Sequence, residues 1–252
     1  MQQTFFIVRY YRIARVSVHT LLGIAIAALI FPLVSQTTRL RTTRWWCKSL
    51  LNCFNIEVVT YGNLPDANTN KTMFIANHIS WTDIHAINSI IPVRFIAKIE
   101  IKSWPIFGYL VSKSGTLFIN RSIRKDAARI VDITTESLKA NDNVCFFPEG
   151  TTTEGTHMLP FKSSITQAAV DAEAYIWPVA IYYPTANRKP NINMAFAGET
   201  TMLESMSAMF KIKKPIVELH FLAPISGSNE TRIGVTEYAN KVITDKFNSL
   251  LN

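Results

Sequence analysis

The stretch that decides the fold is TMFIANHISWTD, residues 72–83. Its apolar start, Thr72–Ala76, is bounded by polar residues, which predicts a short buried strand. Ser80 with Asp83 three positions later has the spacing of a capping box, so we expect Ser80 to be the N-cap of a helix. His78 then lies in a strand-to-helix turn, where Asp83 can hold one ring nitrogen. The other nitrogen would be free to take a proton from a hydroxyl group.

A single loop histidine is more often structural than catalytic, so this interpretation depends on the downstream segments of the chain. Val144–Phe147 (VCFF) predicts a second buried strand, which runs into the turn Pro148-Glu149-Gly150. Gly115–Arg121 (GTLFINR) predicts a third strand that ends on an arginine, before a helix predicted over residues 125–140. Open α/β sheets bind ligands in the crevice beyond their strand ends, so we expect these three ends to form one site.

Two of these polar residues each allow two interpretations. The planar guanidinium of Arg121 matches the oxygens of a phosphate or carboxylate, which suits an anionic head group. Arg121 could equally make a surface salt bridge. Glu149 could belong to a ligand site, or it could be a turn carboxylate that accepts backbone hydrogen bonds.

Taken in order, these segments resemble the four sequence blocks of the glycerophospholipid acyltransferase family, which includes the 1-acylglycerol-3-phosphate acyltransferases. The matching segments are His78 with Asp83 (Asn-His-x4-Asp), Gly115–Arg121, Phe147–Thr151 (FPEGT) and Ile176–Val179 (IWPV). The resemblance covers about residues 55–225. It implies an α/β fold with a mixed, largely parallel central sheet flanked by helices.

The resemblance also implies the reaction and the residues that perform it. His78 would be the base and Asp83 its partner in transferring a fatty acyl group from acyl-CoA or acyl-ACP to the free hydroxyl of a lysophospholipid. No metal or cofactor is implied beyond that acyl donor. The residues expected to bind substrate are Gly115, Asn120, Arg121, Glu149, Gly150, Thr151 and Lys162.

One departure from the family pattern concerns the acceptor. Many members that acylate lysophosphatidate carry an arginine directly after Glu-Gly-Thr, and here that position is Thr152. Lys162 or Arg121 would then bind the phosphate. The form Glu-Gly-Thr-Thr is similar to members that acylate lyso-ornithine lipid. We expect 1-acylglycerol-3-phosphate as the acceptor, giving phosphatidic acid, with lyso-ornithine lipid as the alternative.

Two other classes of protein remain open from the sequence. A lipid hydrolase would use His78 to activate water, and a membrane lipid-binding protein would need no catalysis. The chain contains no Gly-x-Ser-x-Gly motif, so a serine nucleophile of that kind is not expected.

Composition agrees with a lipid enzyme. The 252 residues allow one sizeable α/β domain plus a short appendage. The net charge of +8 suits an anionic membrane surface. No zinc-finger, helix-turn-helix or RNP pattern points to nucleic acid, so none is expected as a partner. The three cysteines have no metal-ligand spacing and are expected to be reduced, buried thiols of a cytosol-facing protein.

The N-terminal region predicts a membrane arm. Residues 16–34 carry no formal charge and are just long enough to cross the hydrocarbon as a helix. A helix over residues 39–54, with Trp45 and Trp46, would lie at the level of the lipid head groups. We therefore expect an arm over residues 1–54 and a catalytic domain over residues 55–252, at the cytosolic face of the inner membrane. The arm could cross the bilayer or dip into one leaflet.

The remaining predicted elements form the scaffold. Helices are expected over residues 81–91 and 231–251, and strands over residues 179–183, 193–197 and 216–222. The aromatic segment Ser103–Leu110 predicts a helix start, whose side chains could line an acyl groove or belong to the core.

Overall fold

The computed structural model describes residues 4–120 and 122–252. The strands are β1 (Glu57–Gly62), β2 (Thr72–Ala76), β3 (Arg94–Lys98), β4 (Leu117–Ile119), β5 (Val144–Phe146), β6 (Tyr175–Tyr182), β7 (Ile216–Phe221) and β8 (Ile225–Ser226). The α-helices are α1 (Phe6–Ala25), α2 (Gln36–Phe54), α3 (Thr82–Ile90), α4 (Phe107–Lys113), α5 (Arg124–Lys139), α6 (Gln167–Asp171), α7 (Met202–Lys211) and α8 (Arg232–Leu251).

The strands form one mixed sheet in the order β1-β7-β6-β2-β5-β3-β4, with β8 beside β6. Neighbours from β6 to β4 run parallel, and β7 and β8 run antiparallel to β6. The predicted fold class, a mixed and largely parallel sheet flanked by helices, is confirmed. Because β6, β2, β5, β3 and β4 share one direction, their carboxyl ends meet at one edge of the sheet.

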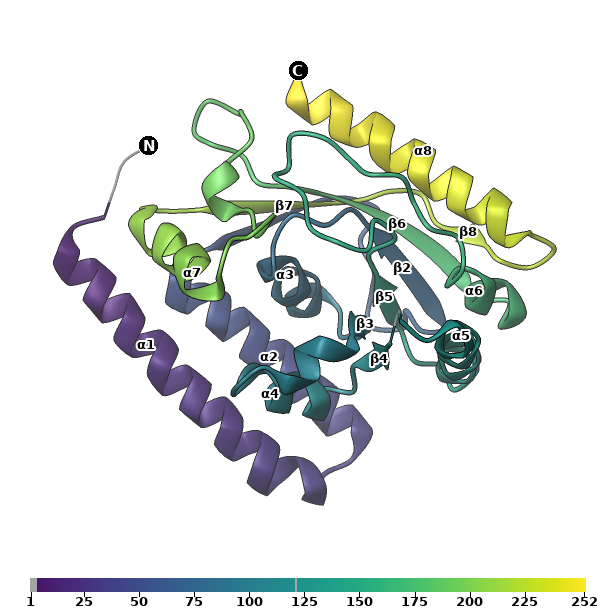
Figure 1. The fold of residues 1–252 in the computed structure, drawn as a ribbon, viewed down its shortest axis with the longest axis horizontal. Coiled ribbons are helices and arrows are strands. Elements are labelled where there is room, and N and C mark those ends of the chain that lie inside the picture. Colours follow the sequence, from purple (N-terminus) through teal and green to yellow (C-terminus); the bar gives the residue numbers. More distant parts are fainter. Residues whose placement is uncertain (1–3, 121) are drawn as a thin grey trace.

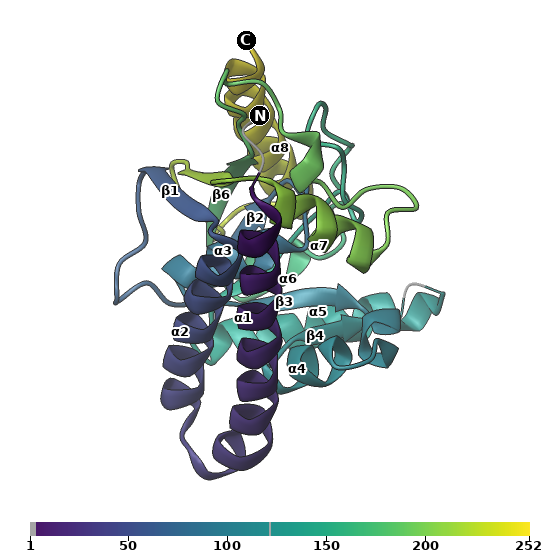
Figure 2. The same ribbon diagram turned by 90° about the vertical axis from the view of Figure 1, so that its left-hand side faces the viewer.

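Helices cover both faces of the sheet (Figures 1 and 2). Alternate residues of β2 enter different cores, as the two-residue period of a strand requires. Met73 and Ile75 pack with residues of α5, α6 and α8, whereas Phe74 and Ala76 pack with residues of α2, α3 and α7. The turn after β2 is therefore held by two packed layers.

Several predicted elements are confirmed, and one is wrong. The strand over residues 72–76 and the helix over residues 231–251 match β2 and α8 closely. The strand expected over residues 193–197 is wrong, because Ile192–Met194 forms a 3-10 turn. Met194 N–H donates to Asn191 O at 2.9 Å, and Phe196 N–H donates to Ile79 O, in the turn after β2, at 2.9 Å, so the segment joins no strand.

The N-terminal arm is a helical hairpin that packs on the sheet domain (Figure 2). Its first helix, α1, continues through a π-helical turn at Ile26–Ile30 and a 3-10 turn at Phe31–Leu33. It begins at Phe6, ten positions before the uncharged run. Arg12 in this extension donates to the carbonyls of Ile212 at 2.7 Å and Lys213 at 2.6 Å, which holds the helix on the sheet domain. The second helix, α2, brings Leu50, Leu51 and Phe54 into the main core.

Candidate active site

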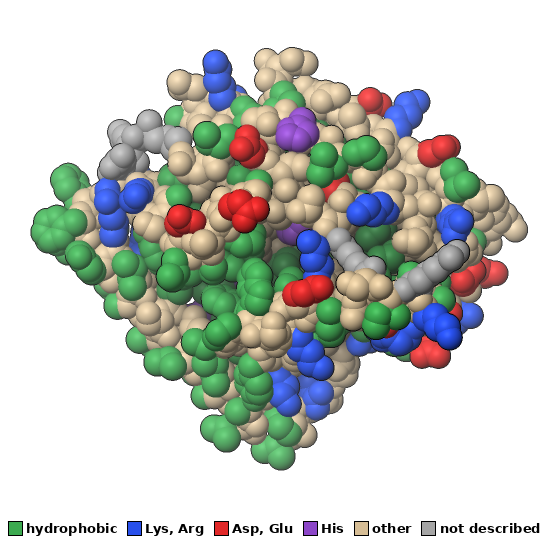
Figure 3. Space-filling model, in the orientation of Figure 1, with side chains coloured by type: hydrophobic (Ala, Val, Ile, Leu, Met, Phe, Trp, Pro, Cys, Tyr) green, Lys and Arg blue, Asp and Glu red, His purple; other side chains and the backbone are tan. Residues whose placement is uncertain are grey.

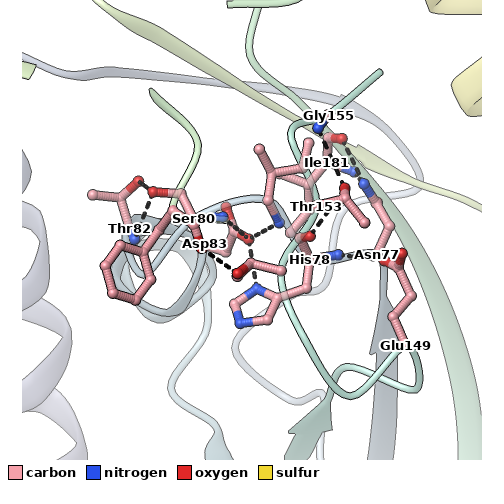
Figure 4. Close-up of polar contacts among 12 residues, drawn as sticks. Asn77, His78, Ser80, Thr82, Asp83, Glu149, Thr153, Gly155 and Ile181 are labelled. Atoms are coloured by element: carbon pink, nitrogen blue, oxygen red, sulfur yellow. Dashed lines mark hydrogen bonds and ion pairs between the residues drawn. The ribbon is translucent and has the colours of Figure 1, made fainter. Parts of the chain in front are cut away.

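The turn after β2 is fixed first by Asn77. Its side-chain amide donates to Ile181 O at 3.0 Å, and its oxygen accepts from Ile181 N–H at 2.7 Å (Figure 4). These two bonds connect the end of β2 to the neighbouring strand β6. Asn77 is buried and both the nitrogen and the oxygen of its side-chain amide are bonded, so the backbone at His78 leaves the sheet in one defined direction.

The expected contact between His78 and Asp83 is present. His78 Nδ1 lies 2.8 Å from Asp83 Oδ2. The same oxygen accepts the backbone N–H groups of Ile79 at 2.8 Å and Ser80 at 2.9 Å, and Tyr183 donates its hydroxyl to Oδ1 at 2.6 Å. Asp83 is fully buried, so these four donors replace the water that would otherwise solvate its charge.

The predicted N-cap is only half correct. Helix α3 begins at Thr82 with Trp81 as its N-cap, which makes no side-chain capping bond. Asp83 does reach back to the N–H of Ser80, as in a capping box. The Ser80 hydroxyl instead accepts from the Thr82 hydroxyl at 3.0 Å. It also accepts the backbone N–H of Thr82 at 3.4 Å, so local bonds to Thr82 replace the bond from Asp83 N–H that a capping box would have.

The surroundings of His78 set its tautomer and its orientation. An ionised carboxylate only accepts hydrogen bonds, so Nδ1 carries the proton and Nε2 keeps its lone pair. The ring stacks on Phe147, with centroids 3.8 Å apart and planes 5° apart. Within the described residues no protein hydrogen bond to Nε2 is found, and 16% of the side chain is exposed. The free nitrogen can thus meet a substrate that enters from outside the protein.

Glu149 holds the histidine turn from the other side. Its Oε1 accepts the backbone N–H of His78 at 2.8 Å, and its Oε2 accepts the N–H of Leu159 at 2.8 Å. Thr153 N–H in turn donates to His78 O at 2.9 Å. Burial raises the pKa of Glu149 above its ordinary value. Of the two interpretations that the sequence allows, these contacts are those of a turn carboxylate.

The other predicted substrate-binding residues divide into two groups. Gly150, Thr151 and Asn120 follow β5 or β4 and lie at the same sheet edge as His78. Gly115 does not, because it precedes β4, has a φ of +83° and accepts a bond from the side chain of Arg94 at 2.8 Å. Arg121 lies outside the described residues.

Thr152, where many family members carry arginine, and Lys162, a candidate for binding the phosphate, both make hydrogen bonds within the protein. The Thr152 hydroxyl donates to the carbonyl of Phe196, which lies in the loop after the 3-10 turn. Lys162 has an exposed side chain, and its backbone N–H donates to Pro148 O at 3.1 Å. An additional cation, Lys98, is exposed at the carboxyl end of β3.

An apolar cavity of about 130 Å³, partly open to solvent, lies between the arm and the sheet domain. Its walls include Trp46 of α2, Phe95 and Ala97 of β3, and Phe107 and Leu110 of α4. Part of the segment Ser103–Leu110 therefore lines a groove, which is one of the two roles that its aromatic residues allow. Phe95 stacks on Phe147 with centroids 5.8 Å apart, so the cavity wall continues to the ring of His78.

Tyr183 is a site residue that the sequence does not indicate. It stands 100 positions from Asp83, and β6 looks like an ordinary apolar strand. Only the parallel pairing of β6 with β2 brings the two residues together. No local pattern could have indicated this contact.

Comparisons with known proteins agree with this geometry. Residues 55–182 match the sequence model of the Acyltransferase family. The chain is 32% identical to the lyso-ornithine lipid O-acyltransferase of Pseudomonas aeruginosa over 205 residues, 81% of this chain and 78% of that protein. It is 41% identical to the 1-acyl-sn-glycerol-3-phosphate acyltransferase of Neisseria gonorrhoeae over 145 residues, 57% of each chain.

A solved structure shares the fold. The crystal structure of the 1-acyl-sn-glycerophosphate acyltransferase from Thermotoga maritima superposes with a TM-score of 0.72 at 20% sequence identity. The match covers 97% of this chain and 95% of that one, so it includes the N-terminal helices as well as the sheet.

Proposed function

The chain belongs to the acyltransferase family and is an O-acyltransferase, and we propose that it acylates the free hydroxyl of a lysophospholipid with acyl-CoA or acyl-ACP as donor. The observation that carries this proposal is the His78–Asp83 pair at 2.8 Å, with Nε2 free at the edge of the sheet. A base in this position can deprotonate a hydroxyl that enters from the open side.

The proposed reaction needs no covalent enzyme intermediate, because a thioester is already activated. His78 Nε2 takes the proton of the lysolipid hydroxyl as its oxygen attacks the thioester carbonyl. Asp83 stabilises the imidazolium that develops. The tetrahedral intermediate then collapses, the carbon–sulfur bond breaks, and the departing thiolate receives the proton from His78. The products are the diacyl lipid and the free thiol of the carrier.

The apolar cavity supports a place for an acyl chain. Its walls are largely aliphatic and aromatic, which is the lining that an acyl chain requires. Since Phe95 connects its wall to Phe147 and His78, a chain in the cavity would present its carbonyl near Nε2.

The acceptor we propose is 1-acylglycerol-3-phosphate, giving phosphatidic acid. Lys98 ends β3, and Asn120 directly follows the neighbouring strand β4, at the edge beside the site. Arg121 is the next residue of the chain. The charge of Lys98 suits a phosphate there. Lyso-ornithine lipid is the second candidate, favoured by Thr152, whose hydroxyl is bonded to Phe196 where many lysophosphatidate enzymes carry arginine.

The proposed location is one leaflet of the inner membrane, with the catalytic domain in the cytosol. The segment Phe6–Leu33 is long and apolar enough to cross a membrane. However, Arg12, Val16, His19 and Gly23 form a buried stripe along α1, against the protein. A helix docked along its length on the catalytic domain fits an arm that lies in one leaflet better than a free span.

The outer side of the arm is apolar, as such a position requires. Figure 3 shows hydrophobic side chains gathered over α1. The most exposed of them are Phe5, Phe6, Ile7, Val18, Leu21, Leu29 and Leu33.

The test is product analysis by mass spectrometry. Purified protein is given acyl-CoA or acyl-ACP with either lysophosphatidate or lyso-ornithine lipid. We expect phosphatidic acid and an equal amount of free carrier thiol. A diacyl ornithine lipid would select the second acceptor. Release of free fatty acid without a diacyl product would indicate a hydrolase, and the absence of any turnover would indicate a lipid-binding protein.

A further inference from the structure

The two carboxylate oxygens of Asp83 have different environments. Oδ2 faces His78 and two backbone amides, whereas Oδ1 accepts the hydroxyl of Tyr183 at 2.6 Å. Tyr183 is itself buried, at 2% exposure. Among the residues described, this phenol is thus the group that solvates the far side of the catalytic carboxylate.

The phenol belongs to a chain of buried hydroxyls. Tyr183 Oη lies 2.7 Å from Thr82 Oγ1, which lies 3.0 Å from Ser80 Oγ. Ser80, Thr82 and Asp83 are all fully buried. The chain therefore has no bulk water to compete with it, and its bonds are stronger than they would be at the surface.

Tyr183 remains a donor throughout the range in which an enzyme works. Burial, the charge of Asp83 and the hydrogen bond to that charge hold the pKa of Tyr183 well above its ordinary value. The phenol consequently keeps its proton, and Asp83 Oδ1 receives a hydrogen bond rather than a like charge.

We propose that Tyr183 is a positioning residue for the transfer reaction: its hydroxyl fixes the rotation of the Asp83 carboxylate and draws negative charge toward Oδ1, which tunes the basicity of His78. This inference rests on the proposed function, because it assumes that His78 is the base. Removing the hydroxyl would leave Oδ1 buried without its donor and concentrate the charge on the oxygen that faces the imidazole. His78 would then hold a proton more tightly.

Tyr183→Phe tests this, since it removes the hydroxyl and keeps the ring. Tyr182→Phe is the matched control: Tyr182 is the preceding residue, and its hydroxyl donates to Arg188 O at 2.5 Å, away from Asp83. We expect Tyr183→Phe to lower kcat by roughly 10-fold, the loss of one hydrogen bond to a charged group, with the KM of both substrates little changed. Tyr182→Phe should behave like wild type.

The pH profile separates tuning from simple packing. We expect the acidic limb of the kcat/KM profile, where His78 becomes protonated, to move to higher pH by roughly 0.5 to 1 unit in Tyr183→Phe. Among the described residues, the other titratable groups facing the pair are Glu149 and Cys145, both present in wild type and variant alike. Cys145 stays a neutral thiol, because burial and the Asp83 charge raise its pKa well above the ordinary value.

Two further experiments test whether Tyr183 acts through Asp83: a substitution of Thr82, and the Tyr183 substitution made in an Asp83→Asn protein. Thr82→Val, which interrupts the hydroxyl chain behind Tyr183, should shift the limb in the same direction by a smaller amount. In an Asp83→Asn background, Tyr183→Phe should lower kcat by less than about twofold. A loss of activity without movement of the limb, or an equal loss in both backgrounds, would overturn the inference, as would full activity in Tyr183→Phe. Wild-type protein with no transferase activity would instead refute the proposed function.

Discussion

The carboxyl group of Asp83 lies at a position that water does not reach. A carboxylate in that place needs hydrogen bonds in place of its hydration, and four donors converge on it. Two of the donors are backbone N–H groups of the turn itself, so the chain conformation that presents His78 also stabilises its partner. Position and electrostatics are therefore set by the same few atoms.

The first prediction concerns this pair. His78→Ala should abolish acyl transfer, because the described part of the chain places no other base beside Asp83 at the open end of the site. Asp83→Asn should lower kcat by roughly 10²- to 10⁴-fold, the range for a general base that is no longer properly oriented. Both are measured with the purified protein on detergent-dispersed lysolipid. Near wild-type turnover in His78→Ala would rule out the mechanism.

The second prediction concerns Glu149, whose two oxygens each accept a backbone N–H. In Glu149→Gln the amide group cannot accept one of these bonds. We expect the free energy of unfolding to fall by about 1 to 3 kcal/mol and activity to fall with it. Glu154→Gln is the control, because Glu154 is exposed in the same loop.

The pH dependence of that difference results from burial. The pKa of Glu149 is raised in the folded protein, chiefly by desolvation, so protonating the carboxyl stabilises the fold. This contribution is fully present below the ordinary glutamate value of 4.5 and is lost as pH rises through the higher folded value. The stability advantage of wild type over Glu149→Gln should thus be larger at low pH than at neutral pH. Denaturant unfolding at both pH values measures it, and a constant difference would contradict the assignment.

At the scale of elements, the site depends on strand ends that meet at one edge and on a cavity walled by several elements. Strands β2, β5, β3 and β4 are neighbours in that order, so residues that come after β2 and β4 lie three strands apart, roughly 14 Å at the usual spacing. That distance suits a substrate with separated parts: a hydroxyl at His78 and a head group farther along the edge. The acyl chain would extend toward the arm.

The third prediction tests the cavity. Ala97 on β3 lines it, so Ala97→Phe should fill part of its volume. We expect kcat/KM for long-chain acyl donors to fall at least roughly 10-fold relative to short-chain donors, since each methylene excluded from an apolar pocket has a cost of this order. Ala128→Phe, on the exposed side of α5, should leave the preference unchanged. Equal losses for all chain lengths would place the acyl chain elsewhere.

At the scale of the whole molecule, the arm has two roles. Its helix α2 packs into the core, and the outer face of α1 forms an apolar surface of the molecule. Helix α2 contributes Leu50, Leu51 and Phe54 to the core, so removing residues 1–54 would open that core to water. Deletion would consequently confuse loss of membrane binding with loss of folding. Substitutions on the outer face of α1 separate the two.

The fourth prediction uses that face. Leu21 and Leu29 are 65% and 68% exposed, so Leu21→Glu with Leu29→Glu should leave the fold intact. Each buried leucine contributes about 1.5 to 3 kcal/mol, and we expect vesicle binding to fall more than tenfold in a flotation assay. Activity on detergent-dispersed lysolipid should persist. Ile233→Glu on α8, at 55% exposure, is the control, and equal binding by all variants would show that another surface holds the membrane.

The sequence by itself determined the local chemistry of this protein. An apolar strand followed by a turn brings His78 and Asp83 within hydrogen-bond distance, because only five positions of chain separate the two residues. The same holds for the helical arm, whose run of uncharged residues predicts a helix whatever surrounds it. The order and spacing of the four blocks were also enough to indicate the family.

Only the tertiary structure decided which distant residues complete the site. It brings Tyr183 to Asp83 across 100 positions and Glu149 to the backbone of His78 across 71, and it leaves Gly115 away from the cluster. It also replaces the strand expected at residues 193–197 with a turn. These outcomes depend on which strands are neighbours in the sheet. Strand order is set by long-range packing, and local apolar and polar patterns do not encode it.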